Sequence, residues 1–352
     1  MRRVKSIIII SFFFITISSK AIDPHFSQFY ASALSLNPAL TGLSYGNLRL
    51  FTNMRNQWSG TTPFQVYSVS ADMTIWQNNG SYDFGGIGLY LQNNSTGTGY
   101  NDQNAMFSFA YHKALNKKHT QYIAMGFQGG IKQLSIGDLT AKTTQSQWLQ
   151  SSGYDGNLSN QLNTTKVSIF NPDFQAGVFW YSFVGKSSTA FAGATVFHVS
   201  SPNESINGNG GKLGRRIVLH GGSKIKYSKK MAVVPNFVFM TQDRVWEVNL
   251  GTAVEYDITK FVKSLSKNPF HRTKPNSQVL SLGTWYRTSD AFILAMGLKY
   301  LDFKFGFSYD LNVSKFSAIS KGNGGFEISL TYDIKKYKTK TTRLSSSPCP
   351  KI

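Results

Sequence analysis

Six histidines, one cysteine and a few glycine-rich stretches are the residues of this chain that could carry chemistry. No histidine is followed two or four residues later by a second ligand that would form a metal pair, and Cys349 has no CxxC partner. No Gly-x-Ser-x-Gly motif occurs, and the stretches at 85–88 and 208–211 lack the features that phosphate binding needs. The sequence therefore predicts no enzyme and no cofactor or metal; a barrel enzyme would need a histidine and a serine that meet in space.

A second kind of chemistry is recognition by buried charge. In the first alternating segment the apolar residues fall on one face of an extended strand, and the other face carries Arg49, Asn53, Arg55 and Gln57. Two interior arginines need acidic partners or a guest, because an unpaired buried charge is costly. Asp72, on the next predicted strand, is a candidate partner. We predict that these five residues form an interior network, which serves either the structure itself or the binding of a client.

The first 21 residues have the features of a secretory signal peptide. Arg2, Arg3 and Lys5 precede an apolar run at 7–17, and Ser19-Lys20-Ala21 supplies small residues at the cleavage position. The run is too short to span a bilayer, and no later segment reaches 18 apolar residues. We therefore expect Sec-type export, and an exported chain is not expected to bind nucleic acid.

The elements that must position the interior charges are strands of alternating polarity. The pattern is clearest at 324–334, where apolar residues occupy one face and Glu327, Ser329, Thr331 and Asp333 occupy the other. Fourteen strands are predicted, at 47–58, 65–74, 85–92, 104–112, 122–133, 173–181, 190–199, 216–227, 233–241, 246–255, 279–287, 292–300, 303–309 and from 326. Pro235 makes one of them imperfect, and small residues blur the period at 190–199 and 216–227.

An even number of half-apolar strands behind an export signal indicates an all-β fold, a transmembrane antiparallel β-barrel with lipid outside and water inside. Only 15% of residues are charged, while 14% are aromatic and 31 are glycine, which suits lipid-facing strands with aromatic girdles. A closed barrel is the structure that satisfies its backbone hydrogen bonds in lipid without helices. We expect an integral protein of the outer membrane of a Gram-negative bacterium, in contact with its lipid.

Basic residues concentrate on one predicted side of this barrel. If both termini lie in the periplasm, the connections at 113–120, 228–230 and 257–278 share that side with the C-terminal tail, and all four are rich in lysine and arginine. The formal net charge is +20. These residues form either a solvated surface or a docking rim for an acidic periplasmic partner. The predicted docking residues are Lys260, Lys263, Lys267, Arg272 and Lys274.

Four parts follow from these patterns. They are a signal peptide at 1–21, an N-terminal segment at 22–46, the barrel at 47–334 and a basic tail at 335–352. The N-terminal segment is too apolar for a disordered tail, and we expect it in the periplasm beneath the barrel or inside the lumen. Its apolar residues are Phe26, Phe29, Tyr30, Leu34, Leu36 and Leu40.

Several short motifs carry a resemblance to a known family. The first are Asp23-Pro-His-Phe-Ser-Gln-Phe-Tyr, Leu36-Asn-Pro-Ala-Leu-Thr-Gly42, and Arg55-Asn-Gln-Trp58 followed by Pro63-Phe-Gln-Val-Tyr-Ser68. The others are Pro172-Asp-Phe-Gln-Ala-Gly-Val-Phe179, Leu282-Gly-Thr-Trp-Tyr-Arg287, Phe307-Ser-Tyr-Asp310, Glu327-Ile-Ser-Leu330 and Cys349-Pro-Lys-Ile352. With these motifs the chain resembles the PorP/SprF family.

The resemblance implies an outer-membrane barrel of the type IX secretion system of Bacteroidota. Members of the family are implicated in secretion or in holding secreted adhesins at the cell surface, including those used in gliding motility. The implied partners are a secreted adhesin or other client, held by its C-terminal domain, and periplasmic or outer-membrane components of the secretion or motility machinery. The alternative is an outer-membrane channel for a small nutrient or hydrophobic compound, since a barrel of fourteen strands is wide enough. The apolar N-terminal segment and the basic side favour the first function, because a plain porin needs neither.

Overall fold

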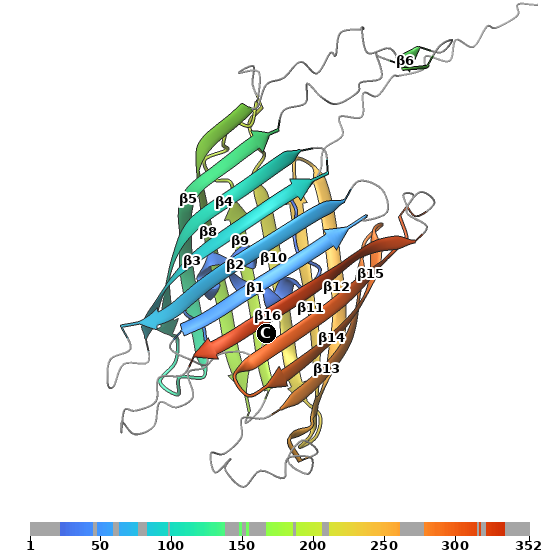
Figure 1. Cartoon of the computed structure of the whole chain (residues 1–352). Coiled ribbons are helices and arrows are strands. Elements are labelled where there is room, and N and C mark those ends of the chain that lie inside the picture. Colours follow the sequence, from blue (N-terminus) through green and yellow to red (C-terminus); the bar gives the residue numbers. More distant parts are fainter. Residues whose placement is uncertain are drawn as a thin grey trace, which may run out of the picture.

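Fourteen antiparallel strands close into one barrel, as predicted (Figure 1). The computed structural model describes residues 22–44, 48–58, 63–76, 83–97, 99–137, 148–149, 153–154, 167–185, 188–205, 211–260, 278–314, 317 and 322–334. The first barrel strands are β1 (Leu48–Gln57), β2 (Phe64–Ile75), β3 (Phe84–Thr96), β4 (Tyr100–Ala114), β5 (Gln121–Ile136), β8 (Val167–Val184) and β9 (Ser188–Phe197). The others are β10 (Arg216–Lys226), β11 (Met231–Gln242), β12 (Val245–Asp257), β13 (Val279–Arg287), β14 (Ala291–Tyr300), β15 (Phe303–Asn312) and β16 (Asn323–Ile334).

The order around the barrel follows the chain, and β16 returns to pair with β1. Two short strands, β6 (Trp148–Leu149) and β7 (Gly153–Tyr154), form a separate two-stranded sheet between β5 and β8. Residue 48 lies opposite residue 334, so β1 begins and β16 ends at the same edge. We call this edge the terminal rim and the opposite edge the loop rim.

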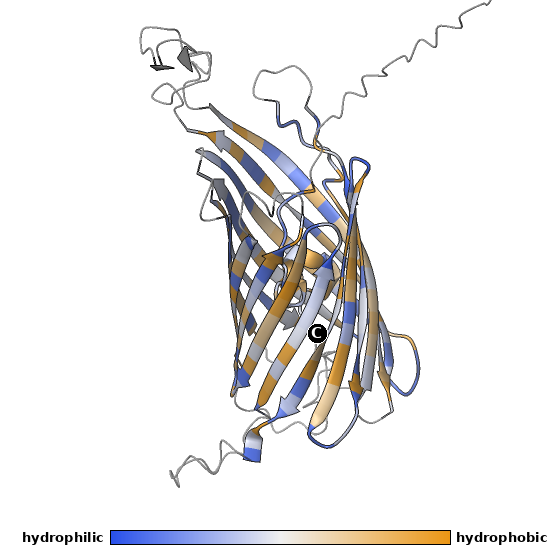
Figure 2. Ribbon diagram, turned by 90° about the vertical axis from the view of Figure 1, so that its right-hand side faces the viewer, coloured by the Kyte–Doolittle hydropathy of each residue, from blue (hydrophilic) through white to orange (hydrophobic). Residues whose placement is uncertain are grey.

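Side chains alternate between lipid and lumen along each strand, and Figure 2 shows the resulting change of hydropathy from residue to residue. On the outer face Val69, Leu89 and Met125 each expose more than half of their surface. On the inner face Ser68 and Ser70, the two neighbours of Val69, are buried. The period of two fixes this register, because a shift by one residue would move every polar side chain into lipid.

Pro235 interrupts the sheet on one side only. It pairs with Thr252 of β12, where the ladder is continuous, but the pairing of β11 with β10 lapses between Val233 and Asn236. Proline cannot donate a ladder hydrogen bond, so an interruption of this kind is its expected effect. The sequence-based expectation of an imperfect strand is thus confirmed at the residue that suggested it.

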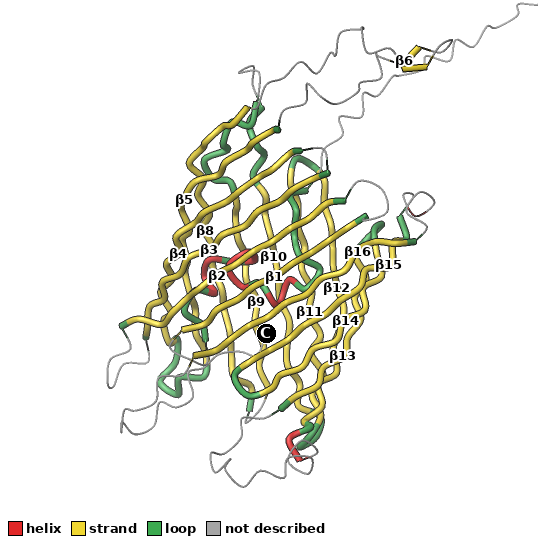
Figure 3. Tube along the Cα trace, in the orientation of Figure 1, coloured by secondary structure: helices red, strands yellow, loops and turns green. Residues whose placement is uncertain are grey.

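Residues 22–44 lie inside the barrel, and we call them the plug segment (Figure 3). They form three single turns, η1 (Phe29–Ala31), α1 (Ala33–Leu36) and η2 (Pro38–Leu40). Most of the buried apolar side chains of the segment pack against aromatic side chains from the wall in one cluster, and Leu34 packs in a second, smaller cluster with Tyr90 and Met106. Within the described ranges, no helix has the length and apolarity to cross a membrane.

Candidate functional site

The plug segment crosses the lumen from one rim to the other. At its start, Asp23 is hydrogen-bonded to His198 and Gln242, which end strands at the loop rim. At its end, the carbonyl of Leu43 accepts from Arg49 near the terminal rim, at 2.7 Å. The segment therefore enters at the loop rim and leaves where β1 begins. Its interface with the wall is the candidate functional site.

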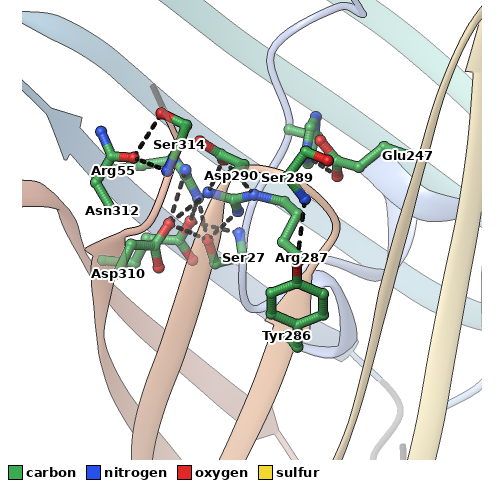
Figure 4. A network of polar contacts seen from close by, with 12 residues as sticks. Ser27, Arg55, Glu247, Tyr286, Arg287, Ser289, Asp290, Asp310, Asn312 and Ser314 are labelled. Atoms are coloured by element: carbon green, nitrogen blue, oxygen red, sulfur yellow. Dashed lines mark hydrogen bonds and ion pairs between the residues drawn. The ribbon is translucent and has the colours of Figure 1, made fainter. Parts of the chain in front are cut away.

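The centre of this interface is a buried ionic cluster from β1, β13, β15 and β16 (Figure 4). Asp310 lies 2.9 Å from Arg55 and 2.8 Å from Arg287. Glu327 pairs with Arg55 and accepts the backbone N–H groups of Ser27 and Gln28, the latter at 2.8 Å. The hydroxyl of Ser27 donates to Asp310 at 2.7 Å and accepts from both arginines. We call these residues the central cluster; in it the wall charges converge on the backbone and hydroxyl of the plug segment.

The four wall charges of the central cluster are balanced. Arg55, Arg287, Asp310 and Glu327 each expose 2% of their surface or less. Burying charges is favourable only when they are paired and their remaining hydrogen-bonding capacity is used. Here two buried cations meet two buried anions, and Arg287 also pairs with the half-buried Asp290 at 2.6 Å. Ser27 makes three more hydrogen bonds, while Arg55 Nε and Asp310 Oδ1 have no hydrogen-bond partner among the described residues. The plug segment is therefore a structural part of the cluster, since its removal would leave several polar groups without partners.

A second ion pair holds the other end of the plug segment. Arg49 and Asp72 lie opposite each other on β1 and β2 and form a two-pronged pair, with both N–O distances 2.9 Å. Asp72 also accepts the N–H of Gly42 at 2.6 Å, and Arg49 donates to the carbonyl of Leu40. Each member of the pair thus bonds both its ionic partner and the backbone of the segment.

Between the central cluster and the Arg49–Asp72 pair, glycines in the wall let the plug segment lie close to the strands. A Cβ added to Gly86 would lie 2.3 Å from the carbonyl oxygen of Thr41, and one added to Gly126 would lie 2.3 Å from the nitrogen of Ala39. Any larger residue at either position would collide with backbone, which cannot rotate away. The lumen wall is therefore shaped to the path of the segment.

Asn37 is the polar anchor of the middle part. Its amide donates to the carbonyl of Val178 at 3.0 Å and lies 3.1 Å from Nε2 of His220, while its oxygen accepts from Ala39 N. Gly177 leaves room for it, since a Cβ there would be 2.1 Å from Asn37 Oδ1. The Asn37 side chain therefore joins the segment to the wall of the barrel.

At the loop rim a histidine lies between two carboxylates. His198 donates to Asp23 at 2.6 Å and to Asp173 at 2.7 Å. Burial opposes protonation, but the bonds to Asp173 and Asp23 raise the pKa of His198 above its ordinary value. Burial likewise opposes ionisation of Asp23, yet the bond from His198 and the charge of Arg216 hold the pKa of Asp23 well below its ordinary value. The two carboxylates that flank His198 therefore favour the protonated form of the imidazole that holds the start of the segment.

The residues proposed from the sequence fall into separate places. Arg49, Arg55 and Asp72 meet the plug segment as described, and Asn53 is buried in the lumen between them, while Gln57 is half-buried at the loop end of β1. Lys260 is exposed at the terminal rim. The other four predicted docking residues, Lys263, Lys267, Arg272 and Lys274, lie outside the described residues. Across those described residues, no group of three or more His, Cys, Asp or Glu is placed to hold a metal.

Sequence reasoning missed the partners of Arg55 and the residues that hold Asp23. The alternation of polarity placed Glu327 on the polar face of its strand. Nothing in that pattern predicted that Glu327 would pair with Arg55, which lies 272 residues earlier in the chain. A usable signal was present in the motifs. Ser27, Asn37, Asp173, Arg287 and Asp310 all belong to the motifs that carry the family resemblance, and all meet at the plug segment or its anchors. These motifs therefore describe one interface.

Comparisons with known proteins agree with the fold. The toluene transporter TbuX of Ralstonia pickettii is similar over 87% of this chain and 94% of its own, with a TM-score of 0.52 and 11% identity. The Pseudomonas putida toluene transporter TodX matches over 88% of this chain and 98% of its own, with a TM-score of 0.47 and 10% identity. At such identities the likeness to TbuX shows a shared barrel fold alone. A search of curated proteins found no match.

A comparison with models of protein families identifies the family of this chain. The model described as "Type IX secretion system membrane protein PorP/SprF" matches residues 18–332, which include the plug segment and thirteen complete barrel strands with most of the fourteenth. The match covers well over half of the chain. With a closed barrel whose outer face is apolar, it also supports an integral place in the outer membrane. The chain belongs to the PorP/SprF family of type IX secretion system membrane proteins.

Proposed function

We propose that this barrel holds a secreted type IX client, such as a surface adhesin of the kind used in gliding, by the C-terminal domain of that client. The observation that carries the proposal is family membership over residues 18–332 combined with a lumen that the chain's own N-terminal segment already occupies. A client would then be held at a rim of the barrel, with the barrel as its membrane anchor. The interior charges Arg49, Arg55 and Asp72 serve this function by fixing the plug segment.

The occupied lumen argues against the alternative of an open channel for a small nutrient. The plug segment bonds to β1, β2, β13, β15 and β16 through charged groups that lie almost entirely out of solvent. A permeating solute would have to displace it, and breaking buried charged pairs costs several kcal/mol. Anchoring requires no such displacement, so it is the function that this interior favours.

A docking surface for the secretion or motility machinery is the second part of the proposal. In the part of the chain that the structure describes, seven lysines are exposed along the terminal rim, on or beside three of its connections. They are Lys113, Lys117, Lys118, Lys226, Lys229, Lys230 and Lys260. Such a concentration of one charge raises the association rate with an acidic partner and weakens with salt. We propose that this rim faces the periplasm and contacts an acidic component there.

The test is co-purification from the native outer membrane. Barrels tagged at an outer loop are isolated at low and at moderate salt, and bound proteins are identified by mass spectrometry. The proposal expects a large secreted protein with a type IX C-terminal domain in both preparations. If the native barrel brings down no such protein while it retains its family's secretion components, anchoring is wrong.

The rim is tested by neutralising Lys117, Lys118, Lys229 and Lys230 to glutamine in one variant and the predicted set from Lys260 to Lys274 in another. Neither set includes a residue of a strand that the structure describes, so barrel abundance should stay constant. We expect reduced co-purification of a periplasmic component and reduced client display, with the difference from the native barrel largest at low salt, where the rim charges are least screened. Unchanged co-purification in both variants would show that the rim is only a solvated surface.

A further inference from the structure

A cavity of about 170 Å³ lies in the lumen between the plug segment and the inner faces of β12 to β16, toward the terminal rim. The plug segment contributes Tyr30, Leu36 and Leu40 to its lining. On the opposite side Trp285 of β13 stacks on Tyr30 with ring centroids 5.2 Å apart, and its indole N–H donates to Asn236 Oδ1 at 2.6 Å. This hydrogen bond fixes the orientation of the indole at the edge of the cavity.

The cavity exists because two neighbouring rows of the barrel wall present small residues to the lumen. The first row crosses β12, β13 and β14, and the second crosses β13, β14 and β15. The rows are Ala253, Gly283 and Ala295, and Ser281, Gly297 and Gly306, all of which line the cavity. An apolar cavity of about 150 Å³ in a protein core holds one benzene ring. The space beside these rows is therefore large enough for one ring.

The charged side chains of the lining already have partners. Arg49 and Glu255 belong to ion pairs, and Lys299 and Lys304 each interact with another group as well. Among the residues that the structure describes, no buried polar side-chain atom that lacks a hydrogen-bond partner belongs to this lining. A charged ligand would therefore lose its hydration without gaining an unpaired partner, and such burial is unfavourable. The lining favours a neutral, apolar molecule.

The route into the cavity starts at the terminal rim. Lys299 and Lys304 lie beside the turn at 301–302 and also belong to the lining, so the cavity extends toward that rim. From the side, the bilayer has no access, because β12 to β16 are paired without interruption along both small rows. Toward the loop rim, the central cluster and the plug segment close the lumen. A small dissolved molecule fits this access better than a lipid chain does.

We propose that this cavity binds a neutral apolar molecule with the size of about one six-membered ring, which enters from the terminal rim. The ring packs beside Tyr30 and Trp285 and over the two rows of small residues. The plug segment stays in place, so the site binds the molecule and gives it no passage through the barrel. This ligand site is separate from the proposed client anchoring. Because Tyr30 belongs to the plug segment, the bound molecule stabilises the seated segment against release.

The first experiment compares three fluorinated probes that share one ring. They are fluorobenzene, 4-fluorobenzoate and 4-fluorobenzylammonium. The full barrel is held in detergent micelles, and fluorine NMR measures the dissociation constant of each probe, with the signal from empty micelles subtracted. We expect one site for fluorobenzene and binding about tenfold weaker for both charged probes, because neither finds an unpaired opposite charge. The inference is overturned if either charged probe binds as tightly as fluorobenzene.

Filling the cavity tests where the probe binds. Ala295→Leu on β14 occupies the space of the ring and should weaken fluorobenzene binding by about tenfold or more. Ala253→Leu on β12 is the second filling variant, should the first not assemble. The matched control is Ala105→Leu, the same change at an exposed position on the lipid face of β4, which should bind fluorobenzene as the native barrel does. A filling variant that assembles and still binds like this control shows that the probe lies elsewhere, and the inference fails.

Hydrogen exchange of the native barrel tests the link to the plug segment without any variant. A ligand that binds only the seated segment slows its release by one plus the ratio of ligand concentration to Kd. At about nine times the Kd of fluorobenzene, peptides that cover residues 28–36 should exchange about tenfold more slowly. Peptides from β4, which does not line the cavity, should keep their rates. Unchanged exchange of residues 28–36 at that concentration also overturns the inference.

Discussion

Replacing Glu327 by glutamine should release the first part of the plug segment while the barrel stays closed. The Glu327 carboxylate accepts the N–H groups of Ser27 and Gln28 and pairs with Arg55. Glutamine keeps the shape, but it removes the charge and presents an amide donor where an acceptor is needed. Breaking a buried ion pair by removing one partner costs about 3–5 kcal/mol. Arg55 retains Asp310 at 2.9 Å, so we take the lower end, about 3 kcal/mol.

A loss of about 3 kcal/mol shifts the equilibrium between seated and released segment by about a hundredfold. Hydrogen exchange followed by mass spectrometry measures this shift directly. Peptides that cover residues 23–31 should exchange about a hundredfold faster, while peptides from the barrel strands should keep their rates. Glu255→Gln is the matched control, because it removes a lumen carboxylate that pairs with wall residue Lys224. If Glu327→Gln exchanges no faster than this control, the central cluster does not hold the segment.

Three further predictions follow from the same interfaces. Gly177→Ala places a Cβ 2.1 Å from Asn37 Oδ1 and should speed exchange of residues 33–41, whereas Gly137→Ala, whose Cβ would meet no atom closer than 3.6 Å, should not. The raised pKa of His198 means that its bonds to Asp23 are fully present below pH 6.5 and are lost as the pH rises through the raised value, while the lowered pKa of Asp23 keeps its contribution above pH 3.8. The protection of residues 22–26 against exchange, corrected for the intrinsic pH dependence of amide exchange, should therefore be highest between these limits and fall at alkaline pH. In His198→Gln this fall in protection should be absent. Val69→Arg, near the middle of β2 on the lipid face, should lower the free energy of unfolding of the barrel by about 2–4 kcal/mol in lipid vesicles. Gln65→Arg, nearer the loop rim on the same face, should lower it by only about 0–1 kcal/mol. Equal losses in the two variants would contradict the assigned membrane position.

The sequence alone determined the number of barrel strands and the alternation of their faces, although several strands, such as β8 at 167–184, are longer than the predicted 173–181. The reason is local: a strand repeats every two residues, and lipid outside with water inside demands opposite polarity on the two faces. Arg49 and Asp72 could be matched in this way because hairpin neighbours are close in the chain. The two strands with a blurred period, β9 and β10, carry small residues such as Gly193 where Asn37 and His220 approach. The weak alternation in these two strands therefore reflects the small residues that make room for the plug segment.

The tertiary structure decided what fills the lumen and which charges pair across it. The apolar character of residues 22–44 required burial but did not choose between a place beneath the barrel and one inside it. Closure of the barrel brings β1 beside β16, and only then does Arg55 meet Glu327 and, one strand further, Asp310. These partners lie more than 250 residues apart in the chain. Local periodicity contains no information about such distances, because they depend on strand number, strand order and the stagger at closure.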